Sequence, residues 1–116
     1  MVEKVGEYGV RKTILIGQET YYEALPVKLS GSANAVVKAG EPIIGDLKDR
    51  ATEFTVGTSN AVGINLHEVK LDANGKGNAT CVFRGAVDVK KIDATVATHI
   101  ETAAIPGIDL VEGSAI

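Results

Sequence analysis

Residues 61–88 of the chain read AVGINLHEVKLDANGKGNATCVFRGAVD, and this stretch decides the expected fold. Two β-prone runs, residues 66–71 and 79–83, flank a polar segment that contains Asn74-Gly75. Asn and Gly both tolerate the positive φ that a tight chain reversal requires. The pattern therefore predicts a β-hairpin at the centre of a β-rich domain.

The composition supports one small domain with an aliphatic core. The chain has 116 residues, of which 45% are hydrophobic but only 4% aromatic, and it contains no Trp. A core of this kind must be built from Val, Ile, Leu and Ala, and the β-branched members suit a pleated sheet. The 13 Gly residues divide the chain into short segments, as many strands and turns require.

Charge and hydropathy argue against two classes of partner. The net charge is −3 and no segment gathers Lys or Arg, so electrostatics give no support to nucleic-acid or membrane binding. No apolar run approaches the roughly 20 residues of a membrane span, and the first residues lack the apolar core of a signal peptide. The single Cys81 lies in a β-prone run, which predicts a buried thiol and folding in a reducing cytoplasm.

The remaining chain predicts short strands and one helix. Strands are expected near residues 26–29, 35–38, 43–44, 52–56 and 108–111, with turns between them. The helix is expected over residues 93–104, because Asp93 suits an N-cap and Val96 and Ile100 share one face. Pro106-Gly107 should end it. The pattern predicts a mainly-β fold, a small β-barrel or sandwich with one short helix in the C-terminal half.

Residues 1–24 differ from the body and form an extended N-terminal arm in our interpretation, leaving residues 25–116 as the β-rich domain. The segment is polar apart from a β-prone apolar island at residues 13–16, and it holds all three tyrosines of the chain. One interpretation is an ordinary first strand with a frayed terminus. The other is an arm that docks on a partner, since Tyr is enriched at interfaces and extended arms add strands to sheet edges.

No motif predicts catalysis, a metal site or a cofactor. His67 and His99 stand apart from any Ser or Cys motif, and one Cys with two isolated His cannot form a zinc site. The carboxylates of residues 46–53 suit a solvated loop. Gly75-Lys76-Gly77 lacks the spacing of a phosphate-binding loop and lies between two strands.

One enzyme family is a weak rival. Residues 105–110, IPGIDL, resemble the Ala-Gly-x-Asp-Leu motif of trimeric dUTPases, and residues 84–88 resemble part of their substrate-binding hairpin. Lys91 stands where that hairpin motif has Tyr, and the two motifs occur in reversed order. We therefore expect that the protein is not an enzyme.

A second resemblance covers about residues 27–111, in the right order. Four segments, AGEPIIG at 39–45, AVGI at 61–64, CVFRGAV at 81–87 and GIDL at 107–110, resemble the lambda-type head decoration proteins of tailed phages. Each segment is common by itself, whereas the ordered set is more specific. The first two dozen residues match less clearly.

This resemblance implies a compact β-tulip-like fold, a homotrimer, and a place on the outside of the virion. Such proteins bind the expanded head at local three-fold positions and stabilise the shell against genome pressure. The partners implied are the major capsid protein and further copies of the chain, without a cofactor, a small-molecule substrate, nucleic acid or a membrane. The arm would pair with strand edges of the capsid protein. We expect the contact to involve the apolar and aromatic arm residues Tyr8, Val10, Ile14, Leu15, Ile16, Tyr21 and Tyr22.

The alternative is a capsid-attached fibre base or adhesion module with a sugar-binding surface. Sugar rings usually pack against exposed aromatic side chains. The body offers only Phe54 and Phe83, and the alternation of their strands predicts that both lie in the core. This expectation makes the adhesion function the weaker hypothesis.

Overall fold

The computed structural model describes residues 22–111 and is mainly strands with one α-helix, which confirms the predicted mainly-β class. The strands in chain order are β1 (Glu23–Ser30), β2 (Val36–Val37), β3 (Pro42–Ile44), β4 (Thr55–Val56), β5 (Gly63–Asn65), β6 (Val69–Lys70), β7 (Lys76–Asp88) and β8 (Ile108–Val111). A 3-10 turn, η1 (Val89–Lys91), leads from β7 into the helix α2 (Ala94–Ala103).

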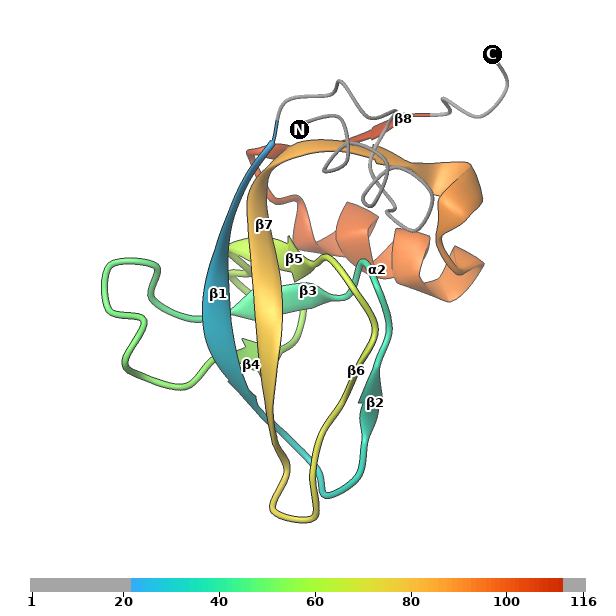
Figure 1. Cartoon of the computed structure of the whole chain (residues 1–116). Coiled ribbons are helices and arrows are strands. Elements are labelled where there is room, and N and C mark those ends of the chain that lie inside the picture. Colours follow the sequence, from blue (N-terminus) through green and yellow to red (C-terminus); the bar gives the residue numbers. More distant parts are fainter. Residues whose placement is uncertain (1–21, 112–116) are drawn as a thin grey trace, which may run out of the picture.

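Strand β7 is the centre of the main sheet, whose order is β1-β7-β5-β3-β4. β1 pairs antiparallel with the first part of β7 along its whole length, and the two long strands run side by side (Figure 1). β5 pairs antiparallel with β7 on its other side. The last part of β7 pairs in parallel with β8, so one strand of 13 residues contacts three partners.

The sheet curls toward a barrel without closing into one. Near the two edges of the described sheet, Leu29 of β1 forms an isolated parallel bridge with Phe54, the residue just before β4. The Phe54 N–H donates to the Lys28 carbonyl at 2.7 Å, and the Ser30 N–H donates to the Phe54 carbonyl at 2.8 Å. No ladder between β1 and β4 continues past this bridge in the described chain. The predicted barrel is therefore an open one, with a seam between β1 and β4.

The predicted hairpin is correct at its tip and wrong along its first arm. The Gly75 N–H donates to the Asp72 carbonyl at 2.9 Å, which forms a tight turn. Gly75, and not Asn74, takes the positive φ, at +77°. The segment before the turn does not follow β7, because β6 pairs with β2 in a separate two-stranded sheet (Figure 1).

Two clusters of buried side chains share β7 as their boundary. One cluster lies toward the helix and consists of Ala61, Ile64, Leu66, Val82, Val87, Val96, Ile100, Ile105 and Ile108. The other lies inside the curl of the sheet and consists of Val27, Leu29, Val37, Ile43, Phe54, Leu71, Ala79 and Cys81. Cys81 is fully buried, as predicted.

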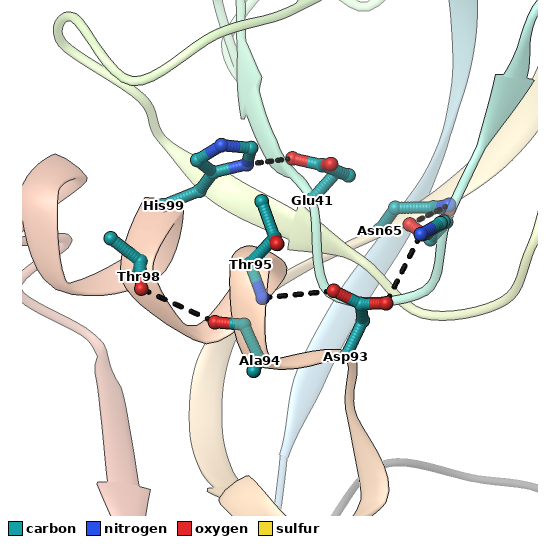
Figure 2. A network of polar contacts seen from close by, with 8 residues as sticks. Glu41, Asn65, Asp93, Ala94, Thr95, Thr98 and His99 are labelled. Atoms are coloured by element: carbon teal, nitrogen blue, oxygen red, sulfur yellow. Dashed lines mark hydrogen bonds and ion pairs between the residues drawn. The ribbon is translucent and has the colours of Figure 1, made fainter.

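Helix α2 begins and ends much as the sequence indicates. The Asp93 carboxylate accepts a hydrogen bond from the Thr95 N–H at 2.8 Å, which confirms the predicted N-cap (Figure 2). The helix ends where Ala104 turns left-handed, before Pro106. Val96 and Ile100 are buried against the body. Gly40 allows the close approach, because a Cβ there would lie 2.8 Å from Cγ1 of Val96.

Candidate functional site

Most of the predicted arm residues lie outside the residues that the structure describes. These are Tyr8, Val10, Ile14, Leu15, Ile16 and Tyr21. Tyr22 is described, and 43% of its surface is exposed. The next residue, Glu23, already belongs to β1, so the arm joins the body at the start of the longest strand pair.

The junction of arm and body is marked by an ion pair between β1 and β7. Glu23 lies opposite Arg84 in the register, and Oε1 of Glu23 is 3.5 Å from Nη1 of Arg84. The Arg84 side chain is 67% exposed, so solvent screens this pair and it contributes little to stability. The pair places Arg84 of β7 beside the start of β1, where the arm joins the body.

Phe83 lies beside this junction and is not the core residue that strand alternation predicts. The register shifts by one residue between Glu23 and Ala24, which lie opposite Arg84 and Val82 respectively. Phe83 is therefore the extra residue of a β-bulge. A bulge turns its residue away from the regular alternation, and Phe83 is half-buried, whereas Phe54 is fully buried as predicted.

The half-buried ring of Phe83 lines an open groove of about 470 Å³, which we call the root groove. Its lining is Leu47, Ala61, Val62, Phe83, Arg84, Ile105, Pro106 and Gly107. These residues come from the β3–β4 loop, the segment before β5, strand β7 and the segment before β8. Six of the eight carry apolar side chains, and Arg84 connects the groove to the arm junction.

A second open groove, of about 400 Å³, occupies the seam where β1 and β4 diverge. This seam groove is lined by Leu29, Ser30, Gly31, Ser32, Ala35, Val36, Val37, Glu41, Thr55, Val56 and Leu71. Val36 and Val56 are 53% and 42% exposed on its borders. Both grooves bring together residues distant in sequence, which is why no local motif indicates them.

The polar groups around helix α2 serve packing and capping. Nδ1 of His99 lies 2.9 Å from Oε1 of Glu41, and this contact ties the helix to the segment before β3 (Figure 2). Lys38 contacts the capping carboxylate of Asp93 at 3.1 Å. The buried Asn65 donates from Nδ2 to the carbonyls of Val37 and Lys38.

Among the described residues, the two histidines and the single cysteine lie apart from one another. His67 is exposed, and His99 lies half-exposed on the helix with an acid and no described nucleophile as its partner. Burial raises the pKa of the Cys81 thiol to about 11, so this thiol is protonated near neutral pH and is a poor nucleophile. Over residues 22–111, no three His, Cys, Asp or Glu side chains gather in a way that could hold a metal ion.

Comparison with known proteins adds no family to this description. No family model, no curated protein and no solved structure matches the chain. Within the described residues, no helix has the length and apolar character needed to cross a membrane.

Proposed function

We propose that this protein is a decoration protein of a tailed-phage head, which binds as a homotrimer to the outside of the expanded shell at local three-fold positions. In this role it reinforces the shell against genome pressure, and it carries no catalytic site. Its partners are the major capsid protein and two further copies of itself.

The observation that carries the proposal is how the family-like segments lie in the fold. The four segments are separated in sequence by up to about 20 residues, yet they form adjacent strands. The segment at 39–45 contributes β3, which pairs with β5 from the segment at 61–64. β5 pairs with β7, and β7 pairs with β8 from the segment at 107–110. A resemblance made of spatial neighbours is better support than four independent short matches.

The arm is the part that we assign to the capsid contact. It leaves the body at the exposed Tyr22, and its β-prone island at residues 13–16 consists of one Thr and three aliphatic residues, as suits strand addition to an open sheet edge. Many copies on one shell would convert a modest affinity for each site into a strong total attachment.

Truncation separates the roles of arm and body. A variant lacking residues 1–20 should form trimers by light scattering and should lose binding to expanded shells in a sedimentation assay. A matched variant that keeps the arm length, Ile14→Ser with Ile16→Ser, should lose binding in the same way. Circular dichroism checks that both variants are folded. Intact shell binding after truncation would refute the arm contact, and a monomeric full-length chain without affinity for shells would refute the decoration function.

One observation favours a second function, a fibre-base or adhesion module that binds sugars. Phe83 is only half-buried, and it lines the root groove together with Arg84. A partly exposed aromatic face is the usual platform for a sugar ring. A glycan array with Phe83→Leu as the control would detect such binding. Absence of any glycan signal that depends on Phe83 would dismiss this function.

One structural observation makes a dUTPase-type activity worth testing. The two fragments that resemble its motifs are neighbours in the fold, since Gly85 to Asp88 pair in parallel with Ile108 to Val111. We expect no release of pyrophosphate from dUTP with or without Mg²⁺, and measurable hydrolysis would overturn the non-enzymatic proposal.

A further inference from the structure

We infer that, in the free protein, the root groove binds the chain's own apolar island, residues 13–16. The arm is then stored on its own body until a partner displaces it. This inference goes beyond the capsid contact, because it concerns the free protein and holds whatever the partner is. The occupant is residues Thr13 to Ile16, which lie outside the described part of the chain.

The position of the groove is the first argument. The undescribed segment ends at residue 21, and Tyr22 continues into Glu23, the ion-pair partner of Arg84. Arg84 itself lines the root groove. The groove therefore begins one side-chain contact away from the point where the arm leaves the body.

The length of the connector is the second argument, and it distinguishes the two grooves. Five residues, 17–21, link the island to Tyr22, and the six Cα–Cα steps from Ile16 to Tyr22 span at most about 22 Å when extended. The seam groove begins at Leu29 near the far end of β1, seven strand residues beyond Tyr22, which cover about 24 Å. Only a fully extended connector would bring the island near the seam groove, whereas the root groove lies at the start of β1, well within its reach. Gly17, directly after the island, permits the reversal that folding back requires.

The chemistry of the groove is the third argument. Its apolar lining includes Leu47, Val62 and Ile105 besides the bulged Phe83. Ile14, Leu15 and Ile16 are consecutive aliphatic residues that a free arm would expose to water. Docking would remove apolar surface from water on both sides of the contact, and burial of this kind is the main favourable term in association.

Storage and capsid binding would then compete for the same residues. The apparent affinity of an arm for any partner falls in proportion to the fraction of arms that are free. A variant that weakens the root groove should therefore bind expanded shells more tightly, whereas arm truncation abolishes that binding. The two variants should change shell binding in opposite directions. Failure of the storage inference can therefore be distinguished from failure of the proposed function.

Disulfide trapping in the full-length chain tests the contact directly. The arm variant Ile14→Cys is combined either with Pro106→Cys in the root groove or with Val36→Cys in the seam groove, and both body positions are exposed. The native Cys81 is buried and does not compete. In dilute solution, the 14–106 pair should oxidise within one chain at least about tenfold faster than the 14–36 pair, because tethering raises the effective concentration. Equal rates, or cross-links formed only between chains, would overturn the inference.

Limited proteolysis supplies a second readout that requires no introduced cysteine. Trypsin cleaves after Lys12, immediately before the island. Pro106→Asp should release the arm and speed this cleavage several-fold, whereas the matched Val36→Asp should leave it unchanged. Melting curves confirm that both variants are folded. An unchanged cleavage rate in folded Pro106→Asp would also overturn the inference.

Discussion

Gly45 and Phe54 are the pair whose separate and joint replacement tests the packing at the seam. Phe54 is fully buried at the one bridge between β1 and β4. A Cβ at Gly45 would lie 2.5 Å from both Cγ and Cε2 of the Phe54 ring and would also collide with Cδ2. The φ of Gly45 is not in the left-handed region, so Ala fits its backbone and the collision accounts for the cost.

The expected magnitudes follow from these contacts. Gly45→Ala overpacks the site and should lower the free energy of unfolding by about 1–3 kcal/mol. Phe54→Ala removes a buried ring and should cost about 3–5 kcal/mol. In the Phe54→Ala background the obstacle is gone, so Gly45→Ala should be neutral or stabilise by up to about 1 kcal/mol through the unfolded state. The coupling free energy between the two sites, which is the difference between these two effects of Gly45→Ala, is then about 1–4 kcal/mol.

Urea unfolding followed by circular dichroism measures all four corners of this cycle. If Phe54→Ala alone is too unstable to fold, Phe54→Leu replaces it, since small domains have only about 5–15 kcal/mol to lose. The matched control is Gly57→Ala, whose Cβ would lie 2.7 Å from the flexible end of Ile44. It should cost less than about 1 kcal/mol in either background, because that side chain can move. An equal cost of Gly45→Ala with and without the Phe54 ring would refute the packing described here.

Three further predictions concern the turn, the acid response and the thiol. Gly75→Ala should destabilise the protein by at least about 1–2 kcal/mol in urea unfolding, because φ is +77° and the new Cβ would strike the Gly31 carbonyl oxygen; a neutral result would contradict the turn geometry. Three carboxylates have a lowered pKa in the folded chain. The backbone amides of Lys76 and Asn74 lower the pKa of Asp72. The Thr95 amide and Lys38 lower the pKa of Asp93, and the Lys76 ammonium lowers the pKa of Glu53. Each of these carboxylates stabilises the fold fully at a pH above its ordinary pKa of 3.8 (Asp) or 4.5 (Glu), and this stability is lost as the pH falls through the lowered folded-state pKa. Between pH 6 and pH 3, the urea midpoint of Asp72→Ala should therefore fall less than that of the parent chain. Cys81, with its pKa near 11, should react with a thiol reagent at pH 8 only at the rate of unfolding, and fast labelling of the folded chain would show that the strand is accessible.

Local chemistry made the helix, the last strand and several turns predictable. Asp93 has the short polar side chain that caps a helix, and the spacing of Val96 and Ile100 gives the buried face. Asn34 and Asn60 lie next to predicted strands, in the segments where turns are expected, and both adopt positive φ in the structure. In each of these cases the information lies within a few residues.

Features that depend on distant partners could not be predicted in the same way. β6 leaves the expected hairpin because its strand partner, β2, lies more than 30 residues earlier in the chain. The bulge at Phe83 depends on register with β1 and has no residue signature of its own. Both grooves combine three or more segments of the chain. Of the predicted arm site, only Tyr22 falls within the described residues, and its role in a capsid contact stays a prediction.

Strand β7 separates two clusters of side chains, and this arrangement has a consequence for how the domain loses its structure. Cys81 and Val82 are adjacent, but one belongs to the cluster inside the curl and the other to the cluster beneath the helix. Neither cluster can come apart while β7 keeps its place, so the two halves are expected to melt in one cooperative transition. Backbone amides in the middle of β7 should then exchange with solvent only through complete unfolding, while those of α2 exchange through smaller openings.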